Sequence, residues 1–177
     1  MTAVDISRNR LKRLEANMAR LGLSVTTVAA DARAFEPQEP FDVILLDAPP
    51  AARRARSGGI PMCPGSSKLT TLKKLSEIQR DLLDRTVSWV KPGGLIVYCT
   101  CSLEPQEGEA QAAAFVERQS GKVGLVPIDP KEIGGLGDCV TKEGYLRCLP
   151  CHKAGTAAES TGMDGFSQPG SVGFNAE

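Results

Sequence analysis

The sequence has no excess of charge of either sign. Its 177 residues contain 21 Lys and Arg and 21 Asp and Glu, so the formal net charge is zero. The basic composition that would indicate a nucleic-acid partner is therefore absent, and any contact with a polyanion must come from a local cluster. Basic residues do gather at 8–13 and at 53–56. A solvated helix face and a loop explain these clusters at least as well, so charge alone does not indicate such binding.

Long apolar runs and an export signal are also missing. No apolar run approaches the roughly 20 residues of a membrane span, and the N-terminus lacks a basic region followed by an apolar core. We therefore expect a cytoplasmic protein with no membrane partner. Without an export signal, six cysteines are better interpreted as reduced thiols than as a disulfide framework. They are Cys63, Cys99, Cys101, Cys139, Cys148 and Cys151.

Strand and helix patterns alternate along the chain. Apolar spacing predicts strands at 2–5, 25–29, 43–46 and 95–100, and helices that begin near Ser7, Leu69 and Pro105. Pro92-Gly93-Gly94 is expected to end the second helix, and a strand pair is expected near Val140 and 145–149. Such alternation favours an α/β fold in which a parallel sheet carries helices on both faces. The length favours one domain.

Polar groups stand where the predicted strands end. Asp5, Asp31 and Asp47 each follow a strand, and Thr100-Cys101-Ser102 follows another. Open α/β sheets bind ligands at the carboxyl ends of their strands, and an acid after a second Rossmann-type strand commonly binds a ribose hydroxyl. Asp5 has that position, although a helix-capping or solvated Asp would explain it equally well.

Three motifs together carry a family resemblance. Asp47-Ala48-Pro49, Lys91-Pro92-Gly93-Gly94 and Thr100-Cys101-Ser102 closely resemble the RsmB/NOP/Sun family of S-adenosylmethionine-dependent RNA cytosine-5 methyltransferases. The resemblance covers nearly the whole chain. It implies a Rossmann-like class I methyltransferase sheet that lacks its first strand. It also implies S-adenosylmethionine as the cofactor and RNA, in particular ribosomal RNA, as the partner.

The resemblance also implies roles for individual residues. Cys101 matches the nucleophile, whose thiolate adds to the cytosine ring beside the carbon to be methylated. Asp47 matches the acid that contacts the ring nitrogen, and it adjoins the cofactor. Asp5 matches the acid that holds the cofactor ribose, Asp31 an acid near the adenine, and Arg10 an arginine that frames the pocket.

Other thiols are interpreted as structural. We expect Cys99 in the core, on the opposite side of the strand from Cys101. The segment Cys148-Leu149-Pro150-Cys151-His152 has the spacing of a haem-attachment motif and of two zinc ligands. Haem attachment would need an export signal, and zinc would need a second ligand pair. We therefore expect no metal.

The chain departs from the family at several places. The glycine-rich loop that follows the first strand is missing with that strand, and Pro50 replaces a cysteine that follows Asp-Ala-Pro and helps to expel the nucleophile. Residues 51–67 have no family counterpart. One choice of synonymous codons for residues 50–67, read from its third base, restores a family-like loop with that cysteine. We therefore expect 51–67 to be an aberrant loop. Our hypothesis is that a local frameshift produced it, and the codons of the nucleotide sequence would test this.

These departures leave alternatives open. We expect 1–166 to be a partial methyltransferase domain and 167–177 to be an aberrant, disordered tail. The main alternative to an enzyme is an inactive fragment or pseudogene product, at best a weak RNA-binding module. A small-molecule methyltransferase is a third interpretation, which is disfavoured because such an enzyme needs no thiol nucleophile at Cys101.

Overall fold

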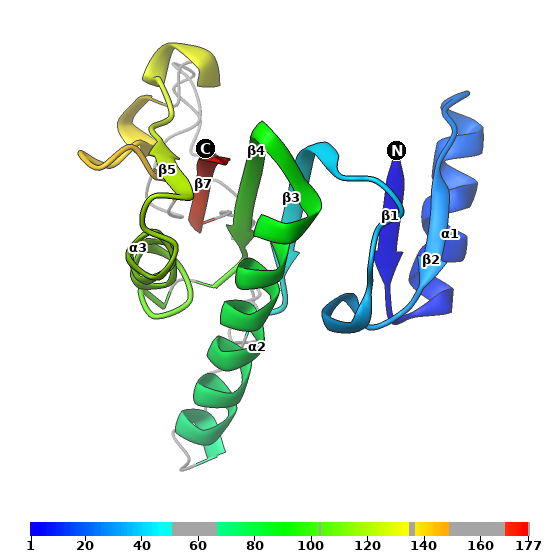
Figure 1. Ribbon diagram of the computed structural model, residues 1–177, viewed down its shortest axis with the longest axis horizontal. Coiled ribbons are helices and arrows are strands. Elements are labelled where there is room, and N and C mark those ends of the chain that lie inside the picture. The colour runs from blue at the N-terminus through cyan, green and yellow to red at the C-terminus, as the bar shows by residue number, and fades with distance from the viewer. Residues whose placement is uncertain (51–66, 103, 135–136, 149–168, 177) are drawn as a thin grey trace, which may run out of the picture. The chain divides into compact units, whose positions relative to one another are not determined.

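The structure is a computed structural model that describes residues 1–50, 67–102, 104–134, 137–148 and 169–176. Its elements are traced in Figure 1. The chain divides into two compact units, a smaller one, Met1–Glu39, and a larger one, Pro40–Glu177. Length alone favoured one domain, whereas the contacts in the structure form two separate clusters.

The smaller unit is a helix that packs on two parallel strands. Asp5, the last residue of the first strand, pairs with Ala29 at the end of the second. Ser7 caps the helix because its side-chain oxygen accepts the N–H of Arg10, and Leu11 is buried as its apolar spacing predicts. The elements are β1 (Thr2–Asp5), α1 (Arg8–Arg20), β2 (Thr26–Ala29) and the short 3-10 helix η1 (Ala32–Ala34).

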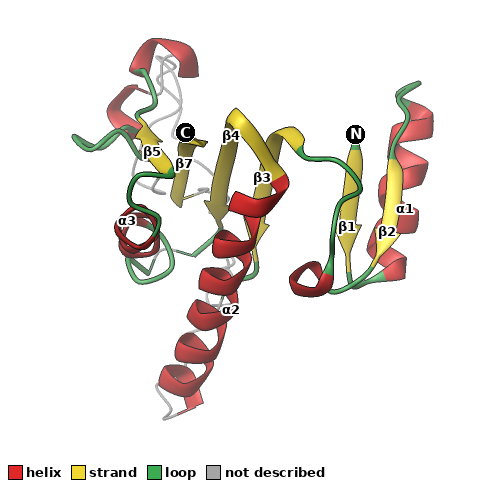
Figure 2. Ribbon diagram, in the orientation of Figure 1, coloured by secondary structure: helices red, strands yellow, loops and turns green. Residues whose placement is uncertain are grey.

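The larger unit contains a mixed sheet in the order β3-β4-β7-β5, with β6 paired to β7. β3 and β4 run parallel, whereas β7 runs antiparallel to both β4 and β5. Figure 2 shows these strands in yellow and the helices in red. The elements are β3 (Phe41–Ala48), α2 (Ser67–Trp89), β4 (Val90–Thr100), α3 (Glu109–Arg118), β5 (Val123–Val126), η2 (Pro130–Ile133), η3 (Gly137–Cys139), β6 (Leu146–Arg147) and β7 (Pro169–Ala176).

The described strands form two separate sheets. In the Rossmann order 3-2-1-4-5-6, the first strand separates the second from the fourth. β1 and β2 take the places of the second and third strands, and they pair with each other. β3 and β4 take the places of the fourth and fifth, and they also pair. The pairs β1-β2 and β3-β4 therefore match this order, and β7 adds an antiparallel strand beyond β4. These pairs agree with the predicted α/β fold class.

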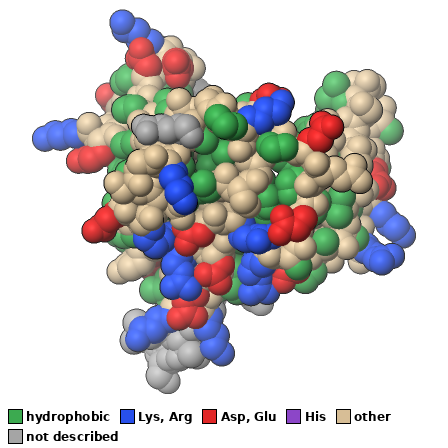
Figure 3. All heavy atoms as spheres, viewed as in Figure 1, with side chains coloured by type: hydrophobic (Ala, Val, Ile, Leu, Met, Phe, Trp, Pro, Cys, Tyr) green, Lys and Arg blue, Asp and Glu red, His purple; other side chains and the backbone are tan. Residues whose placement is uncertain are grey.

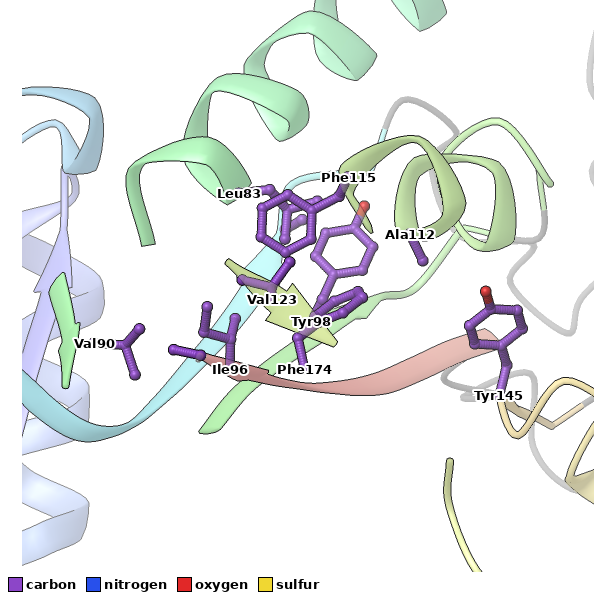
Figure 4. Close-up of a cluster of buried hydrophobic side chains, with 11 residues drawn as sticks. Leu83, Val90, Ile96, Tyr98, Ala112, Phe115, Val123, Tyr145 and Phe174 are labelled. Carbon is purple, nitrogen blue, oxygen red and sulfur yellow. The ribbon is translucent and has the colours of Figure 1, made fainter. Parts of the chain in front are cut away.

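The helices α2 and α3 pack on the same face of the sheet in the larger unit. Leu83 of α2 and Phe115 of α3 belong to one buried cluster with Ile96, Tyr98 and Phe174 from the sheet (Figure 4). The rings of Phe115 and Phe174 meet edge to face with their centroids 4.9 Å apart. This cluster is the hydrophobic core of the larger unit.

The opposite face of β3 remains open. Val43 and Leu45 are 59% and 69% exposed, whereas Ile44 and Leu46, which alternate with them, pack against the core. The sequence predicted helices on both faces, but in the larger unit the described helices cover only one.

The C-terminal segment corrects one prediction. Residues 167–177 were expected to form a disordered tail, but 169–176 form β7, between β4 and β5. Phe174 and Ala176 are buried there, at 0% and 6% exposed. The expectation was wrong because strand formation at this position depends on pairing with distant strands, which a local reading of glycine and proline content does not detect. The all-parallel sheet becomes mixed for the same reason.

Several boundaries also differ from the predicted ones. α2 ends at Trp89, before Pro92-Gly93-Gly94, and β4 already begins at Val90. Gly93 has a φ of +75°, which favours glycine, and a Cβ on Gly94 would lie 2.8 Å from the carbonyl oxygen of Asp42. The glycines thus allow β4 to pass close to β3. α3 begins at Glu109, because residues 105–108 form turns instead of the expected first helical turn.

We predict that Phe174→Ala destabilises the larger unit by about 3–5 kcal/mol, because it removes a fully buried ring from the core. The free energy of unfolding can be measured in urea through the fluorescence of Trp89, the single tryptophan, which is 5% exposed. Val43→Ala, at an exposed position of the same sheet, is the control and should change stability little. Equal stabilities for the two variants would contradict the placement of β7 in the core.

Candidate active site

Parallel pairing of β3 and β4 brings two of the predicted site segments together. Asp47 pairs with Cys99, and Ala48 pairs with Thr100, so both strands end at the same edge. Cys101 is the first residue after β4, and Pro49 the first after β3. The segment Asp47–Pro49 and the turn Thr100–Ser102 are therefore neighbours, as the sequence predicted.

The thiol that lies against Asp47 is Cys99. Its Sγ is 3.8 Å from Asp47 Oδ1 and 3.6 Å from the carbonyl oxygen of Leu46. Cys99 is buried at 4% exposure, which confirms its place in the core. Burial, reinforced by the negative charge of Asp47, raises the pKa of Cys99 to about 12.

Cys101 differs from Cys99 in its accessibility. It is half-buried, and both residues are present as thiols. The turn around it is held from both sides, because the Ser102 N–H donates to Thr100 Oγ1 at 3.2 Å and the Glu104 N–H donates to Ser102 Oγ at 3.2 Å. Thr100 and Ser102 are themselves buried, at 1% and 2% exposed. A reachable thiol thus stands in a well-supported turn.

A buried polar network, which the sequence reasoning missed, lies beneath these two segments. Ser102 Oγ donates to Glu107 Oε2 at 2.5 Å, and Gln79 Nε2 donates to Glu107 Oε1 at 2.6 Å. Gln79 Nε2 also donates to the carbonyl oxygen of Pro49 at 2.9 Å. Gln79 and Glu107 are both 0% exposed. The only feature of the sequence that could have indicated this network is the short spacing of Ser102 and Glu107. Gln79 gives no such indication, because it has the pattern of an ordinary polar helix residue.

The predicted cofactor residues Asp5 and Arg10 contact each other in the smaller unit. Asp5 Oδ1 accepts the Ser7 N–H at 2.7 Å and the Arg10 guanidinium at 2.7 and 3.1 Å. Within the described residues, no hydrogen bond reaches Asp5 Oδ2. One carboxylate oxygen is thus fixed while the other remains able to accept a hydroxyl, which fits the role of a ribose-binding acid.

Asp31 lies at the same edge of the smaller unit, just beyond β2. It caps η1 by accepting the Arg33 N–H at 2.9 Å, and it forms an ion pair with the Arg33 guanidinium at 2.6 Å. The hydrogen bonds from Arg33 lower the pKa of Asp31 to about 2. The pairing of β1 with β2 therefore brings Asp5, Arg10 and Asp31 to one sheet edge. Asp47 belongs to the larger unit.

Several predictions concern residues outside the described ranges. The aberrant loop, except for Ser67 in α2, lies there, and so do Cys63, Cys151 and His152. In the part of the chain that the structure describes, no three His, Cys, Asp or Glu side chains form a group suited to a metal ion. No helix among the described residues is long and apolar enough to cross a membrane.

Charged side chains of both signs are intermixed on the face of α2 in Figure 3. Arg80 pairs with Asp81 at 2.9 Å, and Asp84 of α2 pairs with Arg118 of α3 at 3.0 Å. These exposed charges therefore compensate each other locally.

Solved structures share this fold. A methyltransferase homologue protein from Pyrococcus horikoshii matches 98% of this chain and 52% of its own, with a TM-score of 0.65 and 26% identity. The N-methyltransferase NodS from Bradyrhizobium japonicum, in complex with S-adenosyl-L-homocysteine, matches 99% of this chain and 64% of its own, with a TM-score of 0.50. At 15% identity, NodS shows the fold alone. The fold, with acids and a thiol at its strand ends, is that of a class I methyltransferase.

Sequence comparison defines the class further. The family model of 16S rRNA methyltransferase RsmB/F matches residues 1–158. Ribosomal RNA small subunit methyltransferase B of Vibrio cholerae is 40% identical over 142 residues, which are 76% of this chain and 31% of that relative. The chain belongs to the RsmB/F family of S-adenosylmethionine-dependent rRNA methyltransferases. It spans about a third of the length of the curated relatives that it matches.

We predict that iodoacetamide at pH 8 alkylates Cys101 much faster than Cys99. Cys101 is half-buried, whereas Cys99 is 4% exposed and has a pKa raised to about 12, so almost none of it is thiolate at that pH. Mass spectrometry of digested protein gives the rate for each residue. Denaturation in urea is the control, because it should bring the two rates together. Faster labelling of Cys99 in the folded chain would contradict the described geometry.

Proposed function

We propose that this chain forms part of a cytoplasmic enzyme that transfers a methyl group from S-adenosylmethionine to carbon 5 of cytosine in ribosomal RNA. The observation that supports the proposal most is the pairing of Asp47 with the strand that leads directly into Thr100-Cys101-Ser102. Membership of an rRNA methyltransferase family supports the RNA substrate.

Cys101 acts as the nucleophile in this proposal. Its thiolate forms a bond to the ring carbon beside carbon 5, and the electron pair of the ring double bond becomes available at carbon 5. S-adenosylmethionine, when bound, supplies the methyl group. Transfer of the proton from carbon 5 to solvent and departure of the Cys101 sulfur as a thiolate then restore the double bond.

Asp47 assists by hydrogen bonding the ring nitrogen while charge develops on the base. Its place favours this role because it ends β3 at the same edge as the end of β4. It is an exposed side chain, so a base can reach it. Cys99 is excluded from the nucleophilic role by its burial and raised pKa.

The smaller unit holds the cofactor in this proposal. Asp5 binds a ribose hydroxyl through Oδ2, while Arg10 and the Ser7 N–H keep Oδ1 in place. Asp31 lies at the same edge, near the expected position of the adenine. The carboxylate of Asp5 suits ribose binding, because Oδ1 already accepts hydrogen bonds from Ser7 and Arg10 while Oδ2 can accept one from a hydroxyl.

We predict that a chain of this sequence, extended at its N-terminus by the segment that precedes the matched region in the Vibrio cholerae relative, forms a covalent adduct with RNA containing 5-fluorocytosine. The fluorine blocks loss of the group at carbon 5, so the Cys101 bond persists after methyl transfer. The adduct should require S-adenosylmethionine and withstand denaturation in gel electrophoresis. Cys101→Ala should abolish it.

Cys99→Ala is the matched control for that experiment, because it removes a thiol from the same strand and should leave the adduct in place. Asp47→Asn should slow its formation by about 100-fold or more. An adduct that survives Cys101→Ala would reject the proposed nucleophile. No adduct from the extended chain would favour the alternative of an inactive fragment or a weak RNA-binding module.

We further predict that Asp5→Asn in the extended chain weakens binding of S-adenosyl-L-homocysteine by roughly tenfold or more, because a charged acceptor is lost. Isothermal titration calorimetry measures the change. Asp42→Asn is the control, because Asp42 is an exposed acid that pairs only with Lys91 among the described interactions. Equal affinities for the two variants would reject the cofactor role of Asp5.

A further inference from the structure

Glu107 is a carboxyl group in the core of the larger unit, at 0% exposure. Both of its oxygens are engaged, Oε2 by the Ser102 hydroxyl at 2.5 Å and Oε1 by Gln79 Nε2 at 2.6 Å. Its backbone carbonyl oxygen accepts the hydroxyl of Tyr98, a fully buried β4 residue, at 2.6 Å. Glu107 is therefore fixed to the strand and to the turn on either side of Cys101.

Gln79 extends this attachment to the other site segment. It lies on α2, 28 residues from Glu107, and its Nε2 also donates to the Pro49 carbonyl oxygen at 2.9 Å. Pro49 follows Asp47 by two residues. A continuous set of hydrogen bonds thus runs from Ser102 through Glu107 and Gln79 to the segment that contains Asp47.

Core packing alone does not account for these side chains. Burying a carboxyl and an amide is unfavourable unless they are hydrogen bonded, and apolar residues of similar volume would fill the same space without that requirement. What apolar residues would not provide is a directional connection between two loops. The hydrogen bonds of Gln79 and Glu107 end on the segment Asp47–Pro49 and on the turn Thr100–Ser102, which carry the proposed acid and nucleophile.

We propose that Glu107 and Gln79 are positioning residues, which hold the turn Thr100–Ser102 and the segment Asp47–Pro49 in a fixed arrangement. The importance of that arrangement for methyl transfer rests on the proposed function. The arrangement itself does not, because it is a property of the folded chain. Small displacements of reacting groups can lower rates by about 100-fold, so such a connection matters to a nucleophile and its acid.

The test is the rate at which iodoacetamide alkylates Cys101 in folded variants of this chain. Gln79→Met removes the amide while nearly keeping the volume, and Ser102→Ala removes the hydroxyl that reaches Glu107. Each should raise the Cys101 rate about three- to tenfold, because a lost buried hydrogen bond loosens the turn by about that factor. Glu107→Gln retains an acceptor for Gln79 and can donate to Ser102. Its Cys101 alkylation rate should therefore stay near that of the parent chain.

Gln111→Met is the matched control. Gln111 is also a buried glutamine, 8% exposed, and its Nε2 donates to the Ser76 carbonyl oxygen at 2.6 Å. It connects α3 to α2 without contacting either loop, so its loss should destabilise the chain without accelerating alkylation of Cys101. Buried Cys99 and Cys139 serve as internal references, because general loosening would accelerate all three thiols.

A selective rise for Cys101 in Gln79→Met and Ser102→Ala, absent in Gln111→Met, supports the proposal. A Gln79→Met rate equal to that of Gln111→Met, or a parallel rise for Cys99, overturns it. If Gln79→Met does not fold, Ser102→Ala decides by the same comparison, since it removes one oxygen atom. No arm needs cofactor or RNA, so failure of the proposed methyl transfer leaves this result intact.

In the extended chain, the same variants should lower kcat by about 10- to 100-fold with little change in KM for RNA, because positioning acts on the reaction rather than on binding. A rise in KM at constant kcat would instead assign Gln79 to substrate binding and overturn its role as a positioning residue.

Discussion

The parallel pairing of β3 with β4 is the constraint on which the candidate site depends. Parallel strands end at the same edge of a sheet, so pairing Asp47 with Cys99 places the segments after both strands side by side. The helices α2 and α3 then pack against one face of this strand pair. A shift of one residue in the register would turn Asp47 toward the core and Ala48 away from it. Burial of Ala48 at 1% exposure therefore selects the register as well as stabilising it.

The candidate residues fall into two compact units. Asp47 and the Cys101 turn lie at the ends of adjacent strands in the larger unit. Asp5 and Asp31 share one edge of the smaller sheet. Strand pairing within each unit thus brings its own candidate residues together.

Local patterns predicted much of this arrangement. Runs of apolar residues that end in Asp5, Asp47 and Cys101 identify buried strands and their polar ends, because both features are local. β7 was not predicted, since Phe174 becomes a core residue only through pairing with β4 and β5. The Gln79–Glu107 bond was also inaccessible, because polar residues on helices are normally solvated and 28 residues separate this pair. The long-range contacts, including those beneath the site, could therefore not be predicted from local sequence patterns.

The two thiols at the end of β4 differ in their surroundings, because Cys99 lies against Asp47. A negative charge disfavours thiolate formation nearby, and burial does so more strongly, which together raise the pKa of Cys99 to about 12. Cys99 therefore remains a protonated neighbour of Asp47, able to donate weakly to its Oδ1. Cys101 follows the same strand in a half-exposed turn. Strand length thus separates the two thiols, since one lies inside β4 and the other just beyond its end.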